Sequence, residues 1–264
     1  MKKIEFLNLG RHPITNSYLD LKKPKKEFLY NLRLIYHSNT KLISLAKFVS
    51  PKKMFNNKYA HRASASKTMR SAYEKLAKSL IKTYKPRSVL EIGSNDGCFI
   101  KHFKKIKNIG VEPCKNLADI TTKIKIKTYP DFWTKKLAKK IVNQKGLFDI
   151  IYSANTISHI HNLKETFEAI EISLKKKGIF ILEDPSLLET LKKNSYDQFY
   201  DEHAYVFSLT ALKNLISKTG MEIFKVEKLN THGGSNRVFF KKKINNKFKI
   251  SKKYISYLSD EKKI

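Results

Sequence analysis

Hydrophobic and polar positions follow a regular alternation from Arg87 onward, with short apolar stretches separated by stretches of helical periodicity. The stretches that predict strands are residues 88–92, 108–112, 148–153, 178–183 and, more weakly, 123–129. Helical periodicity is found at residues 98–103, after residue 112, and at 131–142, 163–174 and 209–219, before Gly220 as a C-cap. Two last strands, 222–228 and 237–241, follow each other directly. This order predicts an α/β fold with a mainly parallel seven-stranded sheet and an antiparallel last strand.

The flanking segments have weaker patterns. Before Arg87, residues 28–36 and 41–45 predict two strands, and a helix is expected from near Ser66 to before Pro86. After residue 241 the chain is rich in lysine and has only a weak helical pattern. We therefore expect three parts: a small irregular N-terminal region (1–70), an α/β domain (71–241) and a C-terminal tail (242–264).

The formal charge of +31 raises the question of nucleic acid, because dense positive charge neutralises phosphates. Only six of the 54 basic residues are arginine, whose planar fork suits nucleic-acid contacts, and the lysines are spread along the whole chain. This distribution favours a solvated lysine surface over a nucleic-acid partner. No apolar run approaches the roughly 20 residues of a membrane span, and residues 1–6 lack the apolar core of a signal peptide. Two cysteines cannot form a disulfide framework, so we expect a cytoplasmic protein.

The turn after the first parallel strand carries the candidate cofactor site. Gly93 and Gly97 allow a tight turn and close approach of a ligand, and the N–H groups of a following helix can bind a carboxylate such as the methionine end of S-adenosylmethionine (SAM). Glu112 ends the second strand, where an acidic side chain accepts hydrogen bonds from ribose hydroxyls. We expect SAM to be bound by Glu91, Gly93, Ser94, Asn95, Asp96, Gly97 and Glu112. The alternative is an ordinary strand-to-helix turn.

Two further loops are expected at the same edge of the sheet, because ligands bind at the carboxyl ends of parallel strands. Asp131 and Phe132, after the third strand, are candidates for an adenine contact and an apolar plane. Ser153 and Asn155, after the fourth strand, are candidates for polar contacts to the methionine part. For Asp131 the alternative is a helix N-cap.

Four parts of the chain resemble the sugar-nucleotide C-methyltransferase family, which adds branch methyl groups to deoxysugars. They are residues 9–16 (LGRHPITN), the loop 90–97 (LEIGSNDG), the loop 154–160 (ANTISHI), and the pair 199–203 (FYDEH) and 231–237 (THGGSNR). The resemblance extends from about residue 6 to about residue 241. It implies a Rossmann-like class I SAM methyltransferase fold, SAM as cofactor, and a nucleotide-linked deoxy-ketosugar as the small-molecule substrate.

The chain departs from the family pattern in two places. Family members carry a zinc domain with two cysteine pairs; here the first pair would precede Met1, and the second falls at residues 37–40, where His37 and Thr40 replace cysteine. A structural zinc needs four ligands, so we expect no zinc. The family also continues into a further C-terminal domain, which is absent beyond Ile264. We therefore expect a shortened relative or a fragment, whose residues 242–264 are a remnant of that domain.

The resemblance also assigns catalytic roles. C-methylation of a ketosugar needs a base to remove a proton beside the carbonyl and a donor for the developing oxyanion. The resemblance implies that His203 is the base, that Glu202 orients it or holds the sugar, and that Tyr200 donates to the enolate. It implies that His159 contacts the substrate carbonyl and Tyr59 reaches the sugar, and we expect Arg237 to contact a phosphate. For His12, His102 and His161 we prefer a structural interpretation.

Three other functions remain open. A nucleic-acid or protein methyltransferase acting on an amino group typically has an Asn/Asp-Pro-Pro-Tyr/Phe loop after the fourth strand, and residues 153–156 (SANT) argue against it. A methyltransferase for another small molecule is the second. The third is a degenerate, non-catalytic SAM-binding module. The two missing features favour it, and the intact loop at residues 200–203 opposes it.

Overall fold

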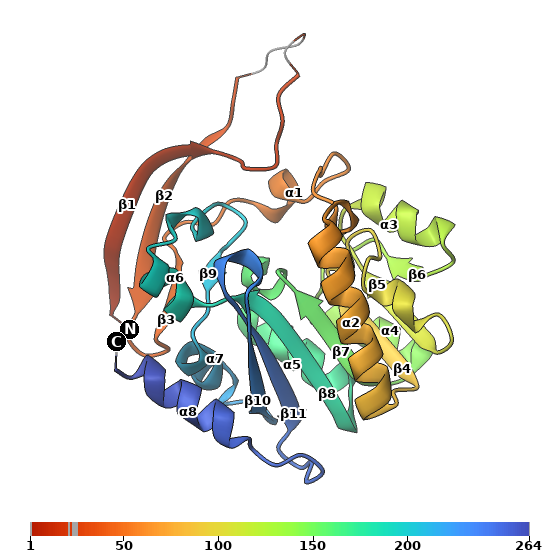
Figure 1. Ribbon diagram of the computed structural model, residues 1–264. Coiled ribbons are helices and arrows are strands. Elements are labelled where there is room, and N and C mark those ends of the chain that lie inside the picture. Colours follow the sequence, from red (N-terminus) through yellow and green to blue (C-terminus); the bar gives the residue numbers. More distant parts are fainter. Residues whose placement is uncertain (1, 21, 23–25, 264) are drawn as a thin grey trace.

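The protein folds around two sheets in the computed structural model, which describes residues 2–20, 22 and 26–263 (Figure 1). The larger sheet has seven strands in the order β10-β11-β8-β7-β4-β5-β6, and the smaller has four in the order β1-β2-β3-β9. The strands are β1 Lys3–Pro13, β2 Leu29–His37, β3 Leu42–Leu45, β4 Ser88–Ile92, β5 Lys107–Val111, β6 Lys127–Tyr129, β7 Phe148–Ala154, β8 Leu174–Pro185, β9 Tyr205–Val206, β10 Met221–Leu229 and β11 Ser235–Lys242. The helices are α1 Pro51–Met54, α2 Lys67–Tyr84, α3 Lys115–Lys123, α4 Lys135–Lys145, α5 Leu163–Ser173, α6 Leu187–Lys193, α7 Leu209–Ile216 and α8 Lys252–Glu261.

The seven-stranded sheet confirms the predicted α/β fold. Strands β4, β5, β6, β7 and β8 pair in parallel, and the last strand, β11, lies antiparallel between β8 and β10. Both faces are covered, so successive residues of β4 enter different cores: Val89 packs with α2, whereas Leu90 and Ile92 pack with α4, α5 and α7. Burial on both faces explains why Val89, Leu90 and Ile92 are all apolar although they do not lie on one face.

Several predicted elements have different bounds. The helix expected at residues 131–142 is Lys135–Lys145, and the helix expected at 209–219 ends at Ile216 with Ser217, not Gly220, as its C-cap. The helix expected directly after the glycine turn is only the 3₁₀ helix Ile100–Phe103. The strand expected at residues 123–129 is confined to β6, because the last turn of α3 reaches Lys123 and the chain turns before Ile126. The larger sheet is otherwise close to its predicted form.

The four-stranded sheet joins distant parts of the chain. β1 and β2 form an antiparallel pair, β3 continues it, and β9 completes the sheet through the pairs Ile43–Val206 and Ser44–Tyr205. The two predicted strands correspond to β2 and β3, whereas β1 and β9 were not predicted. The sheet therefore connects the N-terminal segment to the chain just beyond residues 200–203.

The C-terminal segment packs against the larger sheet. Tyr254 of α8 is buried in the main core, and the N–H of Ser251 donates to the carbonyl of Phe224. The carboxylate of Glu261 accepts hydrogen bonds from the N–H groups of Leu209 and Thr210 at the start of α7. The division into three parts stays a prediction.

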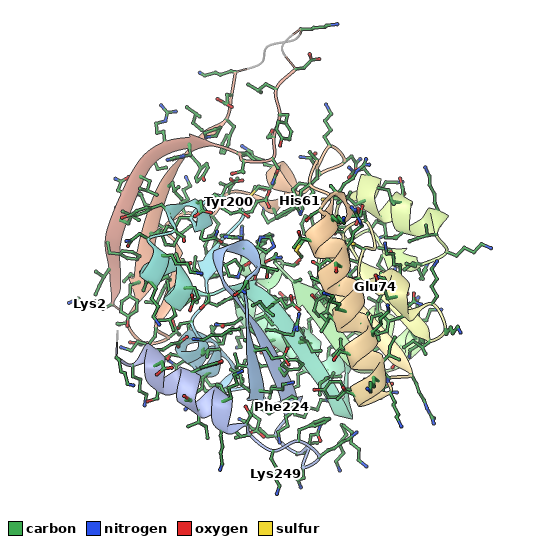
Figure 2. The ribbon with its side chains drawn as sticks, viewed as in Figure 1. Lys2, His61, Glu74, Tyr200, Phe224 and Lys249 are labelled. Carbon is green, nitrogen blue, oxygen red and sulfur yellow. The ribbon has the colours of Figure 1, made fainter. Side chains whose placement is uncertain are left out.

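Many of the lysines lie on the surface, as the outward direction of Lys2 and Lys249 illustrates (Figure 2). Within the described residues, no helix is both long and apolar enough to cross a membrane.

Candidate active site

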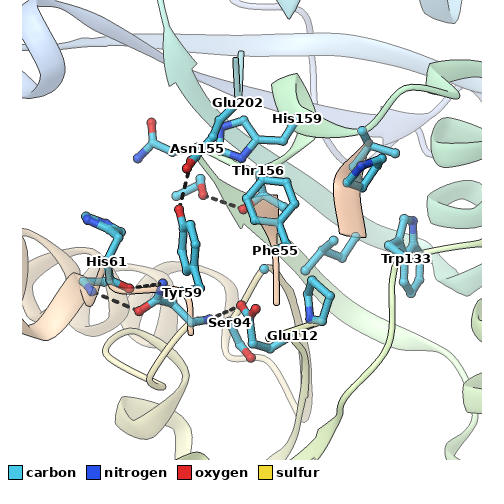
Figure 3. Close-up of a pocket in the computed structure, with 18 of the residues that line it drawn as sticks. Phe55, Tyr59, His61, Ser94, Glu112, Trp133, Asn155, Thr156, His159 and Glu202 are labelled. Atoms are coloured by element: carbon cyan, nitrogen blue, oxygen red, sulfur yellow. Dashed lines mark hydrogen bonds between the residues drawn. The ribbon is translucent and has the colours of Figure 1, made fainter. Parts of the chain in front are cut away.

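A cavity of about 570 Å³ opens at the carboxyl ends of β4, β5 and β7 (Figure 3). Residues of the N-terminal segment, the glycine loop and the loop at 200–203 all contribute to its wall. The predicted site residues that line it are Tyr59, Glu91, Gly93, Ser94, Asn95, Glu112, Phe132, Asn155, His159, Tyr200, Glu202 and His203. The predicted site residues that do not line it are Asp96, Gly97, Asp131, Ser153 and Arg237.

Gly93 makes the tight turn at the floor of the cavity. Its φ is +73°, a conformation that favours glycine, and its N–H donates to the carbonyl of Val111. A β-carbon at this position would lie 2.1 Å from Oγ1 of Thr156. The loop therefore depends on the absence of a side chain as much as on its backbone conformation.

Two buried carboxylates face the cavity beside this turn. Oε2 of Glu112 accepts a hydrogen bond from the N–H of Asn95, and Oε1 accepts one from Cys114, both at 2.9 Å. Burial raises the pKa of Glu112, against the lowering effect of these hydrogen bonds. Burial also raises the pKa of Glu91 well above its ordinary value, while the N–H of Ile100 donates to its Oε2. These carboxylates suit a ligand that carries hydroxyl or ammonium donors.

Asn95 and Asp96 are occupied largely with another part of the chain. Oδ1 of Asn95 accepts a hydrogen bond from the N–H of Ala63, and its Nδ2 donates to the carbonyl of His61. Oδ2 of Asp96 accepts hydrogen bonds from the N–H and the hydroxyl of Ser64. Asn95 and Asp96 thus connect the glycine loop to residues 61–64, the segment before α2, through hydrogen bonds.

The loops after β6 and β7 contribute less than expected. Oδ1 of Asp131 accepts a hydrogen bond from the N–H of Phe132, and only Phe132 of the two lines the cavity. The N-cap of α4 is Thr134, so the alternative role of Asp131 as a helix cap is wrong. Ser153 is fully buried, and its hydroxyl donates to the carbonyl of Ile92.

Arg237 lies on β11, outside the cavity. Its guanidinium donates to the carboxylates of Glu183 and Glu227, at 2.5 and 2.9 Å. Glu227 on β10 and Glu183 on β8 are the cross-strand neighbours of Arg237 on its two sides. The two ion pairs therefore account for the position of Arg237. We therefore leave Arg237 out of the proposed site.

His203 is held in one tautomer. Its Nδ1 lies 2.7 Å from the carbonyl oxygen of Gln198, which can only accept, so the neutral ring carries its proton on Nδ1. The lone pair of Nε2 then accepts a hydrogen bond from the hydroxyl of Tyr200, at 3.1 Å. Burial lowers the pKa of His203 to about 4, so the imidazole is neutral at physiological pH. Its Nε2 is available as a base.

Glu202 is fixed by two neutral donors. Oε1 accepts a hydrogen bond from Nδ2 of Asn16 at 2.6 Å, and Oε2 accepts one from the hydroxyl of Tyr59 at 2.9 Å (Figure 3). Burial raises the pKa values of both Glu202 and Tyr59. Tyr59 thus lines the cavity, and its hydroxyl also holds the carboxylate of Glu202 in place.

His159 follows β7 on the 3₁₀ turn Ile157–His159. Its ring stacks on Phe55 with ring centroids 5.5 Å apart, and lies 5.3 Å from the ring of His203. Its Nε2 is buried and has no hydrogen-bond partner among the described residues. Burial lowers the pKa of His159 well below its ordinary value. A neutral imidazole with one unused nitrogen is therefore available to a ligand.

Several residues of the wall were not predicted from the sequence. His161 was given a structural interpretation, but it lines the cavity and stacks on Phe48 at 4.5 Å. His232 also lines the cavity, and its Nε2 lies 3.2 Å from Nδ2 of Asn155. Asn16 belonged to a recognised motif without a role assigned to it. Of the described residues, no three or more His, Cys, Asp or Glu side chains are grouped so that they could hold a metal ion.

Known proteins resemble the chain in sequence and in fold. Residues 59–226 match the family described as "Methyltransferase domain". The C-methyltransferase NovU of Streptomyces niveus is 27% identical over 242 residues, which cover 89% of this chain and 57% of NovU. The chain thus spans little more than half the length of this curated relative.

Solved structures share the fold. A protein of Pyrococcus horikoshii has a TM-score of 0.54 and 18% identity, over 74% of this chain and 97% of its own. An S-adenosylmethionine-dependent methyltransferase of Clostridium acetobutylicum has a TM-score of 0.51 and 14% identity, over 65% of this chain and 91% of its own.

Proposed function

We propose that this chain, which belongs to the methyltransferase domain family, is a SAM-dependent methyltransferase and that it methylates a carbon atom of a nucleotide-linked deoxy-ketosugar. The observation that carries the proposal is the neutral His203, whose Nε2 lone pair lies in the same cavity as the glycine loop. The similarity to a C-methyltransferase supports transfer to carbon. The sugar substrate follows from the resemblance of the motifs.

The cofactor side of the cavity has groups that fit SAM. We propose that Glu112 accepts hydrogen bonds from the ribose hydroxyls through lone pairs that its two backbone donors leave unused. Glu91 faces the same space, and its carboxyl group can accept a hydrogen bond from the ammonium group of the methionine part. Phe132 provides an apolar wall for adenine. SAM supplies an electrophilic methyl group on a positively charged sulfur.

On the substrate side, the residues generate and hold an enolate. Nε2 of His203 removes a proton from the carbon beside the ketone, so that the C–H bond electrons form the enolate. Tyr200, which donates to Nε2 here, turns its hydroxyl to the enolate oxygen, and His159 donates to the same oxygen from its unpartnered Nε2. With SAM bound, the enolate carbon would take up the methyl group: the C–C bond would form as the S–CH₃ bond breaks, and the sulfur would leave as the neutral thioether S-adenosylhomocysteine. His203 keeps the proton and releases it to water afterwards.

The cofactor assignment is tested by the change Glu112→Ala. It removes the proposed charge-assisted hydrogen bonds to the ribose, so we expect SAM binding to weaken by about 2 kcal/mol, or roughly 30-fold. Isothermal titration calorimetry with SAM measures the effect. Glu74→Ala is the matched control, because Glu74 is exposed on α2, where it pairs with Lys78, and does not line the cavity. Equal affinities for the native protein and Glu112→Ala would contradict this role of Glu112.

The substrate assignment is tested by incubating the native protein with isotope-labelled SAM and a panel of nucleotide-linked 4-ketosugars. We expect transfer of label to a sugar carbon, and exchange of the acidic C–H with deuterated water even without methyl transfer, because deprotonation comes first. SAM binding without either reaction across the panel would favour a non-catalytic module. Label transfer to another small molecule alone would retain the methyltransferase and reject the sugar.

A further inference from the structure

The substrate loop, residues 200–203, has no regular secondary structure, yet it carries the proposed base. Three of its side chains are almost completely buried: Asp201 is 1% exposed, Glu202 2% and His203 6%. A turn does not fix side chains by its own backbone hydrogen bonds as a helix or strand does. The position of this loop must therefore come from contacts with other segments.

The contact that holds Asp201 comes from the opposite end of the sequence. The N–H and the hydroxyl of Thr15 both donate to Oδ1 of Asp201, at 3.1 and 2.7 Å, across 186 residues of chain. The neighbouring pair, Asn16 and Glu202, repeats the connection beside it at 2.6 Å. Two consecutive residues on one segment thus bind two consecutive residues on the other.

Apart from Thr15 and the nearby hydroxyl of Tyr30, the buried Asp201 has few polar neighbours. Within the part of the chain that the structure describes, its Oδ2 has no hydrogen-bond partner, and no lysine or arginine forms an ion pair with its carboxylate. Neither Thr15 nor Asp201 lines the cavity. Burying a carboxylate with so few partners is costly, and an apolar side chain would remove that cost. The cost indicates a role that an apolar residue could not fill.

We propose that Thr15 and Asp201 form a positioning clamp that fixes the substrate loop, so that Glu202 and His203 face the cavity. This inference rests on the proposed function for its catalytic consequence. Neither residue contacts the substrate; both act through their neighbours in the loop. The resemblance to the sugar-nucleotide family gives no role to either position.

The first measurement is turnover with the sugar substrate. Thr15→Val removes the hydroxyl and keeps the N–H, so we expect kcat to fall about tenfold, and Asp201→Ala removes both bonds and is expected to lower kcat about 100-fold, as small misplacements of catalytic groups do. The Kd for SAM should stay unchanged. Thr15→Ser should restore native kcat, and Thr15→Val should add no further loss to Asp201→Ala. Thr83→Val, at an exposed position near the end of α2, is the matched control.

The second measurement does not depend on activity. With ¹⁵N-labelled histidine, NMR follows the tautomer and titration of His203, whose pKa is about 4 while the loop is buried. In Thr15→Val and Asp201→Ala we expect the Nδ1-protonated form to become less populated and the pKa to rise toward 6.5. The groups around the ring, Asp197, Tyr200, His159 and His232, remain in every variant.

The two measurements separate the two claims. If the native protein transfers methyl groups to none of the ketosugars, the proposed function fails, and the titration of His203 still decides the clamp. Native tautomer and pKa in Thr15→Val and in Asp201→Ala would overturn the clamp, whatever the activity. If Asp201→Ala does not fold, Thr15→Val alone decides, because Thr15 lies at the surface.

Discussion

Replacing His203 by asparagine is expected to reduce methyl transfer by roughly 10²–10⁴-fold, which corresponds to roughly 3–5 kcal/mol of activation barrier. Asparagine can keep a hydrogen bond in the loop, but it cannot accept the proton from carbon. Exchange of the acidic C–H of the sugar with deuterated water should stop together with methyl transfer. The Kd for SAM should not change, because His203 lies on the substrate side of the cavity. Single-turnover kinetics and calorimetry on the same variant measure both quantities.

The matched control for this variant is His102→Asn. His102 lies on the 3₁₀ helix Ile100–Phe103, is half-buried, and does not line the cavity, whereas His161 does and is unsuitable. The base must be neutral to act, and a pKa lowered to about 4 keeps it neutral as the pH falls through 6.5. The acid limb of kcat/KM should therefore lie near pH 4. Undiminished exchange in His203→Asn would move the role of base to His159 or Tyr200.

The change Gly93→Ala is expected to destabilise the protein by roughly 4 kcal/mol and to abolish SAM binding. A side chain is strained at a φ of +73°, and the new β-carbon would lie 2.1 Å from Oγ1 of Thr156. Relief of this overlap must move the floor of the cofactor site. Denaturant unfolding gives the free energy of unfolding, and calorimetry gives the affinity for SAM.

Gly146→Ala separates backbone strain from overlap. Gly146 has a similar φ of +67°, but no heavy atom lies within 4 Å of the position its β-carbon would take. We expect this variant to lose only roughly 1–2 kcal/mol and to bind SAM normally. In Gly93→Ala, the second change Thr156→Ala should restore part of the stability. Native SAM affinity in Gly93→Ala alone would show that the turn is not part of the cofactor site.

The larger sheet was predictable because its parallel strands contain short apolar stretches that are covered on both faces, as Val89, Leu90 and Ile92 illustrate. β1 was not predictable in the same way. Its apolar residues lie on both faces of an edge strand, where Ile4 and Phe6 are exposed and Leu7 is half-buried, so they form no regular period. β9 has only two residues and exists because β3 offers a free edge. Strands of this kind depend on the assembled fold more than on local pattern.

The same distinction applies to the site. Residues that belong to local motifs, such as Gly93, Glu112 and His203, could be selected from the sequence, and the structure brings them to one cavity. His161 carried no local signal, and His232 lies in a recognised motif but had no role assigned to it; the fold places both beside that cavity. Arg237 shows the opposite case: it belongs to a recognised motif, but its charge is paired with Glu183 and Glu227. A motif therefore identifies a neighbourhood and does not by itself assign a role to each member. The catalytic roles stay predictions.

The pairing of β3 with β9 has a consequence for synthesis on the ribosome. Ile43 and its partner Val206 are 163 residues apart in the sequence. At a synthesis rate of 5–20 residues per second, the edge of β3 therefore stays unpaired for roughly 10–30 s before β9 is made. During this interval the nascent N-terminal sheet exposes an unpaired edge, which is a site of association with other chains. The parallel strands β4, β5 and β7 emerge earlier than β9. The strands that carry the proposed SAM site can thus fold before the loop that carries His203 is assembled.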